Sequence, residues 1–173
     1  MSPSGLERLE ALEAIRELPL RYSTAIEHRD VDAMAALFSP NARFGSFGEG
    51  EAGLRALMGD SMSTSVFAVI LVANHLVDLE SPVRAQGQVW ARCYAQNDPG
   101  PFIEQLIRYD DTYELVDGQW RFLRRRHRLY FGAEVAASPL DQPAANWPER
   151  QVGVGDLPLA DPLFAAWHAK RPG

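Results

Sequence analysis

Three side chains that can exchange protons stand among apolar neighbours in this sequence. Tyr22 and Glu27 lie five positions apart on a predicted helix, and His75 lies on a predicted strand. A histidine beside a carboxylate can act as a general base near neutral pH, because the carboxylate fixes its tautomer and stabilises the imidazolium. A tyrosine hydroxyl can donate a hydrogen bond to an oxygen that gains negative charge. Together these residue types indicate acid–base chemistry on a small molecule.

Each candidate also has a structural explanation. The predicted strand face of His75 carries three apolar residues, Ala73, Val77 and Leu79. A histidine on such a face is commonly a hydrogen-bonded core residue. Tyr22 falls on the apolar stripe of its helix, where its hydroxyl would need only one hydrogen-bond partner. The residue types alone therefore leave a core role open beside the catalytic one.

The spacing of Tyr22 and Glu27 sets a geometric condition on a shared site. Five positions correspond to about 140° around an ideal helix. The two side chains reach one pocket only if the helix end bends or Glu27 curls back. A negative charge near a helix C-terminus is also disfavoured by the helix dipole. Glu27 could instead be a solvated residue near the helix end.

One predicted strand carries candidate substrate-binding residues. Trp90, Arg92 and Tyr94 alternate along it and share a face, while Val89, Ala91, Cys93 and Ala95 form the other face. One face should line the cavity and the other should meet solvent or another subunit. The sequence does not decide between them.

Phe44 and Arg126 complete the binding candidates. Arg126 would share a strand face with Trp120, Phe122, Arg124 and Arg128. An arginine at a pocket mouth could hold an anionic or enolate oxygen. The same run of charges could equally form a solvated strand face.

Motifs for metal, nucleotide or nucleophilic chemistry are absent from the sequence. The four histidines, His28, His75, His127 and His168, have no metal-binding spacing. There is no G-x-S-x-G, phosphate-binding loop or dinucleotide fingerprint. Cys93 is expected to be a small buried hydrophobe. We therefore expect neither a cofactor nor a metal.

Composition excludes several kinds of partner. The net charge of −6 disfavours nucleic acid and anionic membranes. The longest apolar run, residues 66–73, is far shorter than the ~18 residues that a membrane span needs. A single cysteine permits no intrachain disulfide and fits a reducing compartment. We expect one cavity domain in a cytoplasmic protein.

Periodicity predicts helices first and strands later. An apolar stripe predicts a helix from residue 6 to 26, with a kink or split at Pro19. Shorter helices at 31–38 and 51–62 flank a short strand at 42–47. Long strands follow at 69–80, 88–96, 102–116 and 119–131, with Asp117-Gly118 as a hairpin turn. This order predicts an α+β fold with about three N-terminal helices on one face of a curved, mostly antiparallel sheet.

The last part of the chain differs in character. Residues 132–173 hold six of the twelve prolines but keep aromatic residues, which disordered tails lack. We expect a cavity domain over residues 1–131. The remainder is then a Pro-rich C-terminal arm that docks on its own or a neighbouring subunit.

Three segments resemble the SnoaL-like branch of the nuclear transport factor 2-like superfamily. They are residues 15–44, which contain RYSTAIEHRD, the pair Asn74-His75, and DGQWRF at 117–122 with Arg126. The resemblance covers residues 9–131 and lies near scytalone dehydratase, bile-acid dehydratase and hexachlorocyclohexane dehydrochlorinase. It implies a conical α+β barrel enclosing a deep apolar pocket, and a homotrimer or homodimer. Tyr22 and His75 match the lyases' tyrosine and histidine, and Glu27 stands where those lyases carry aspartate.

The resulting hypothesis is a cofactor-independent lyase acting on a hydrophobic aromatic or polycyclic molecule. His75, oriented by Glu27, would remove a proton from carbon while Tyr22 assists the oxygen or leaving group. The same residues could serve an isomerase or a polyketide cyclase. A non-enzymatic ligand-binding domain is the alternative from another class.

Overall fold

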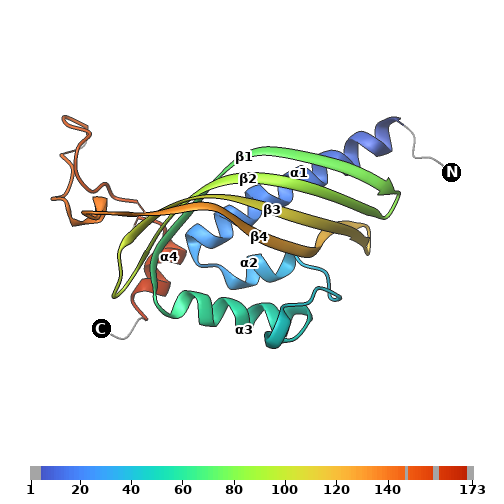
Figure 1. The fold of residues 1–173 in the computed structure, drawn as a ribbon, viewed down its shortest axis with the longest axis horizontal. Coiled ribbons are helices and arrows are strands. Elements are labelled where there is room, and N and C mark those ends of the chain that lie inside the picture. The colour runs from blue at the N-terminus through green and yellow to red at the C-terminus, as the bar shows by residue number, and fades with distance from the viewer. Residues whose placement is uncertain (1–4, 147, 158–159, 171–173) are drawn as a thin grey trace.

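The computed structural model describes residues 5–146, 148–157 and 160–170. Three helices cover one face of a curved four-stranded sheet (Figure 1). All neighbouring strands are antiparallel in the order β1-β2-β3-β4, and the sheet does not close on itself. The predicted α+β class is therefore confirmed. The elements are α1 Gly5–His28, α2 Val31–Ala36, η1 Gly45–Phe47, α3 Gly50–Ser63, β1 Ser65–Ser81, β2 Arg84–Asn97, β3 Phe102–Val116, β4 Gln119–Val135, η2 Pro139–Asp141 and α4 Pro162–His168.

The core lies between the helices and the face of the sheet that they cover. Ile15 of α1, Met34 of α2 and Leu54 of α3 are fully buried. Tyr113 of β3 and Phe122 of β4 meet them from the sheet and are also fully buried. Burying a large apolar side chain stabilises a fold by about 1.5–3 kcal/mol. The helices are therefore held on this face, which we call the inner face, by side chains from every layer.

Helix α1 runs as one element through Pro19, so the predicted split does not occur. It lies along β1 in the opposite direction. Its C-terminal end reaches the start of β1, where Arg29 donates a 3.0 Å hydrogen bond to Ser65. Its middle lies near the centre of β1, where the charge of Arg16 acts on His75.

The predicted strand at 42–47 is wrong. Gly45, Gly48 and Gly50 all have positive φ, a conformation that breaks an extended strand, and residues 45–47 form a 3-10 turn. The backbone that pairs with the sheet lies earlier, where Phe38 forms a parallel bridge with Phe122 of β4.

Two strand irregularities decide which side chains face the core. On β1, Val72 pairs with Ala91 and His75 pairs with Val89. Two residues of β1 therefore lie opposite a single residue of β2. On β4, Phe122 pairs with Tyr113 and Arg124 with Thr112, which leaves one extra residue between them. Each bulge reverses the alternation of the strand beyond it.

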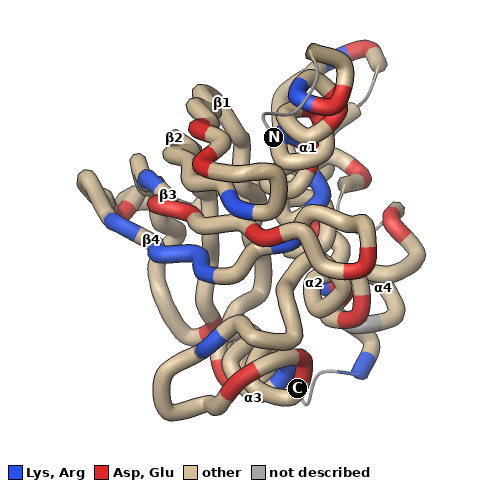
Figure 2. The backbone as a smooth tube through the Cα atoms, turned by 90° about the vertical axis from the view of Figure 1, so that its right-hand side faces the viewer, with Lys and Arg blue, Asp and Glu red and all other residues tan. Residues whose placement is uncertain are grey.

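Because of these bulges, the predicted assignment of side chains to strand faces is wrong on β1 and on β4. Ala73 is exposed and does not share the buried face with His75. Arg126 does not lie with Phe122; its neighbour Arg125 does, with the guanidinium carbon 4.2 Å from the Phe122 ring centre. Figure 2 shows the basic stretch of β4 as consecutive blue segments. Within this stretch the Arg125 side chain is nearly fully buried, at 5% exposed.

Described residues of the C-terminal region contact both β2 and α1. Ser138 bonds Gln96 of β2 at 2.5 Å, and Asp161 lies 3.4 Å from His28 of α1. Strand β4 continues to Val135, beyond the predicted boundary at 131. The division into a cavity domain and a docking arm stays a prediction. No described helix has the length and apolar character needed to cross a membrane.

Candidate functional site

The structure does not bring Glu27 and His75 together. Among the described residues Glu27 makes no hydrogen bond or ion pair, and the hydrogen-bond partner of His75 is Tyr113. Arg16, whose charge acts on His75, precedes Glu27 by eleven positions, which is about 16 Å along α1. Glu27 therefore lies near the start of β1, away from His75. The structure shows no contact through which Glu27 orients His75, and that role stays a prediction.

His75, which is half-buried, instead belongs to a chain of polar side chains whose other members are largely buried. Its Nε2 lies 3.1 Å from the Tyr113 hydroxyl, which donates to Asp111 Oδ2 at 3.1 Å. Arg125 donates to both Asp111 oxygens, from Nε to Oδ1 at 3.1 Å and from Nη2 to Oδ2 at 2.8 Å. We call His75, Tyr113, Asp111 and Arg125 the buried network. It joins β1, β3 and β4 on the inner face.

The Arg125 guanidinium is enclosed by aromatic rings. Its central carbon lies 4.0 Å from the ring centre of Tyr109, 4.2 Å from Phe122 and 4.6 Å from Tyr22. Cation–π contacts of this kind favour a buried positive charge. Tyr22, a catalytic candidate from the sequence, thus contacts the network because its ring packs on the Arg125 guanidinium. Burial raises the pKa of its hydroxyl, which stays protonated at neutral pH.

Burial and charge keep His75 neutral. Loss of solvent contact, together with the positive charges of Arg125 and Arg16, lowers the pKa of His75 to about 4. Burial likewise raises the pKa of Tyr113, with the Asp111 charge adding to the shift. Burial also raises the pKa of Asp111, and Arg125 opposes that shift. At neutral pH the imidazole and the phenol are both uncharged.

The hydrogen-bond directions identify the tautomer of His75. A phenol has one proton, and Tyr113 uses it toward Asp111. The 3.1 Å contact with His75 is then a donation from Nε2–H to the Tyr113 oxygen. Nδ1 keeps its lone pair, is buried, and has no hydrogen-bond partner among the described residues. Nδ1 is therefore the atom through which His75 can accept a proton.

The predicted binding face of β2 points away from this network. Val89, Ala91 and Cys93 are buried on the inner face. Trp90 lies on the opposite face, where its ring centre is 5.8 Å from Tyr130, and Arg92 pairs with Glu104 at 2.7 Å. Tyr94 alternates with Cys93 and lies on this outer face too. The structure therefore places Trp90, Arg92 and Tyr94 outside the site.

Arg126 and Phe44 also lie outside the network. Arg126 is exposed and lines a groove on the outer face with Gln88 and Thr112. Phe44 packs on Phe38 with ring centres 5.4 Å apart and supports the core between α2 and β4. Among the described residues, neither side chain makes a hydrogen bond to a member of the buried network.

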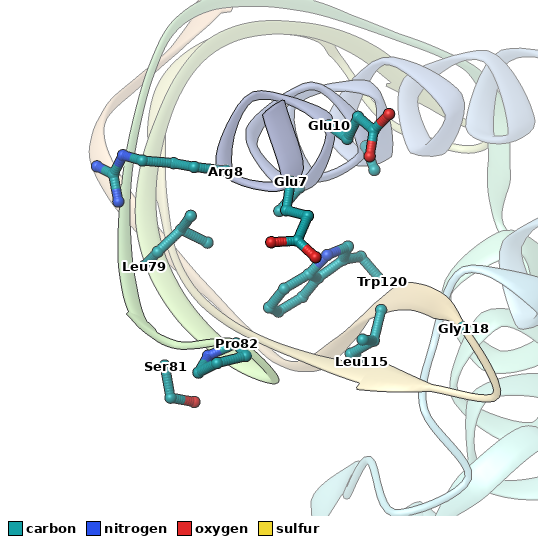
Figure 3. Close-up of a pocket in the computed structure, with 11 residues that line it drawn as sticks. Glu7, Arg8, Glu10, Leu79, Ser81, Pro82, Leu115, Gly118 and Trp120 are labelled. Atoms are coloured by element: carbon teal, nitrogen blue, oxygen red, sulfur yellow. The ribbon is translucent and has the colours of Figure 1, made fainter. Parts of the chain in front are cut away.

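A pocket of about 520 Å³ opens beside the network (Figure 3). The start of α1 and the turns of the two hairpins surround it, with Leu79, Leu115 and Trp120 among its lining residues. Leu115 and Trp120 form the cross-strand pair that follows Tyr113 and Phe122 on the inner face. The volume suits a small molecule. None of the four network residues lines the pocket.

The described residues hold no group of three or more potential ligands that could bind a metal. The arrangement can instead move protons. A neutral imidazole offers Nδ1 as an acceptor, and a buried cation, Arg125, favours negative charge nearby.

The low pKa of His75 makes a prediction about stability. The folded state binds the proton less well than the unfolded chain, so this contribution to stability is complete above pH 6.5 and is lost as the pH falls toward 4. One pKa unit corresponds to about 1.4 kcal/mol, but water screens the partly exposed ring, so we expect a loss of about 1–2 kcal/mol. Urea unfolding at pH 7 and pH 4 measures it. The His75→Gln variant should lack this part of the pH dependence, and an equal dependence in both proteins would contradict the assignment.

Solved structures with this fold include enzymes and proteins without a known role. A protein of Novosphingobium aromaticivorans provisionally described as a scytalone dehydratase shares 21% identity, with a TM-score of 0.67, over 78% of this chain and 94% of its own. A hexachlorocyclohexane dehydrochlorinase of Novosphingobium barchaimii shares 20% identity, with a TM-score of 0.72, over 78% and 97%. A protein of unknown function from Mycobacterium tuberculosis shares 22% identity, with a TM-score of 0.57, over 70% and 77%. These similarities establish the shared fold.

The sequence itself carries the family assignment. No protein of curated function matches it at a significant level. A model of the SnoaL-like domain matches residues 7–126. This span contains all but the first two residues of α1, the helices α2 and α3, and the strands β1 to β3. It also contains the predicted Tyr22, Glu27 and His75 and all of the buried network. This chain therefore belongs to the SnoaL-like domain family.

Proposed function

We propose that this protein is a cofactor-independent lyase that acts on a hydrophobic aromatic or polycyclic small molecule. The observation that carries the proposal is the free lone pair of His75 Nδ1, held in a neutral imidazole by the buried network. A dehydratase-like and a dehydrochlorinase structure with the same fold support an elimination reaction. We place the protein in the cytoplasm as a homotrimer or homodimer, in keeping with the expectation from sequence.

The proposed step needs only groups that the chain and the substrate supply. His75 Nδ1 takes a proton from carbon, the C–H electron pair forms a C=C bond, and the bond to the leaving group breaks. The leaving group departs as halide, after which His75 releases its proton to water, or as hydroxide that takes the proton from His75 and becomes water. Because a base with a pKa of about 4 is weak, the C–H must be acidified, most simply by an adjacent carbonyl.

Tyr22 and Arg125 would stabilise the oxygen that becomes negative. Tyr22 has a protonated hydroxyl, and Arg125 holds a positive charge beneath its ring. A preorganised donor and cation in a water-poor site lower the energy of an enolate-like transition state. An isomerase or cyclase would use the same proton removal and return the proton to a different atom, or form a ring bond.

A non-enzymatic ligand-binding domain is the second candidate, favoured by one observation. The pocket of Figure 3 has the volume for a ligand but no network residue in its lining. In that case the ligand would bind beside Leu115 and Trp120, and the network would serve the core alone.

The test combines turnover with binding. Purified protein is incubated in D2O with hydrophobic cyclic β-hydroxy ketones, scytalone and hexachlorocyclohexane, without added metal. Product C=C absorbance, chloride release and deuterium incorporation are measured. We expect turnover or exchange by the wild type and none by His75→Gln. Ligand-induced thermal stabilisation without turnover or exchange in any arm would favour the binding domain.

A further inference from the structure

The contact between His75 and Tyr113 joins two strands that are not neighbours. His75 is on β1 and Tyr113 is on β3, with β2 between them. Adjacent strands lie about 4.8 Å apart, so the two backbones are separated by about 10 Å. Any side chain that spans this gap must pass over an inner-face residue of β2. That residue is Gly87, which pairs with Val77 on one side and Asp111 on the other.

Gly87 leaves the space that this contact occupies. A Cβ atom placed on it would lie 3.3 Å from His75 Nε2 and 3.3 Å from Tyr113 Cε2. It would also lie 2.7 Å from the Leu76 carbonyl oxygen, a separation that real Cβ atoms essentially never show. Even alanine would therefore press on the imidazole, on the phenol ring and on the backbone of β1.

The backbone conformation does not explain this glycine. Six other glycines have positive φ, and Gly87 is not among them. Glycine in the interior of a strand weakens it, because it loses more conformational freedom on folding and packs no side chain. Its presence here is explained by the close approach of the two rings and of the Leu76 carbonyl oxygen.

We propose that Gly87 is a positioning residue: the missing side chain lets His75 donate Nε2–H to Tyr113 and so leaves Nδ1 as the proton acceptor. The catalytic meaning of Nδ1 rests on the proposed function. The positioning itself is a property of the folded protein and can be measured without a substrate.

The test reads the tautomer of His75 by ¹⁵N NMR at pH 7. In the wild type we expect a protonated Nε2 and a bare Nδ1. In Gly87→Ala the two resonances should move toward each other, as in a mixture of tautomers, and kcat should fall about 10- to 100-fold from the displaced base. Gly132→Ala is the matched control, because a Cβ there meets only side-chain atoms, at 3.7 Å or more. It should leave the tautomer unchanged.

Three results would overturn the inference. They are a wild type protonated on Nδ1, a folded Gly87→Ala variant with the wild-type tautomer, and a Gly132→Ala variant that changes as much as Gly87→Ala. If Gly87→Ala does not fold, Tyr113→Phe removes the same contact without a clash and must also lose the single tautomer; a retained tautomer would overturn the proposal. Loss of the proposed activity in the wild type would leave the NMR result standing, so the two failures are distinguishable.

Discussion

Replacing Arg125 with methionine is expected to lower the free energy of unfolding by about 3–5 kcal/mol. The substitution keeps an unbranched apolar stem but leaves the Asp111 carboxylate, whose side chain is 0% exposed, without its cation. A buried charge without a partner costs far more than the ion pair contributes, because water no longer solvates it. The aromatic rings of Tyr109 and Phe122 also lose their cation–π partner. Urea unfolding at pH 7 measures the loss.

Arg126→Met is the matched control for this experiment. Arg126 is the next residue on β4 but is exposed on the outer face. Its replacement should change stability by no more than about 0.5 kcal/mol. Equal effects of the two substitutions would contradict the burial of the Arg125–Asp111 pair.

The loss of unfolding free energy caused by Arg125→Met should become smaller at acidic pH. Burial already raises the pKa of Asp111 above the ordinary value, and loss of the opposing Arg125 charge raises it further. Protonation then removes the unpaired charge, so the difference from the wild type narrows as the pH falls. Arg125→Met combined with Asp111→Leu should recover much of the stability at pH 7, because no buried charge remains.

Local signals in the sequence were enough for most of the fold. The Asp117-Gly118 turn has positive φ at both residues and closes the hairpin between Val116 and Gln119, as predicted. The strand predicted at 102–116 has the observed bounds of β3. These features depend on residues close in sequence, and the order of helices and strands followed from them.

The faces of β1 and β4 could not be predicted in the same way. Simple alternation places Arg126 with Phe122, but the extra residue at the bulge brings Arg125 inward instead. A bulge depends on how two strands pair, and a single-strand pattern contains no sign of it. The same reasoning applies to Ala73, next to the β1 bulge.

One signal for the buried network was present in the sequence. Tyr109, Asp111, Tyr113 and Leu115 alternate on one face of β3. An aspartate on a face of aromatic and apolar residues is rarely buried without a partner, and that misfit indicates a cation opposite it. The contact of His75 with Tyr113 was not predictable, because it crosses β2 through the space at Gly87.

The prediction for His75→Gln is the largest in catalysis: kcat should fall about 10²- to 10⁴-fold on any substrate that the wild type turns over. A glutamine amide can still donate to the Tyr113 oxygen, as Nε2–H does, but it has no basic lone pair in place of Nδ1. The variant therefore separates the loss of the base from the loss of the hydrogen bond. Unfolding at pH 7 should show a retained fold.

Glu27→Gln is the companion variant, because the sequence paired Glu27 with His75 and the structure does not. Glu27 has no hydrogen bond or ion pair among the described residues, so we expect kcat within about threefold of the wild type. The pH profile supplies an independent check. A base with a pKa of about 4 must be deprotonated to act, so kcat/KM should rise through pH 4 and stay level above it. A Glu27→Gln variant as inactive as His75→Gln, together with a wild-type profile of kcat/KM that rises near pH 6.5, would instead show that the carboxylate moves onto His75 when substrate binds.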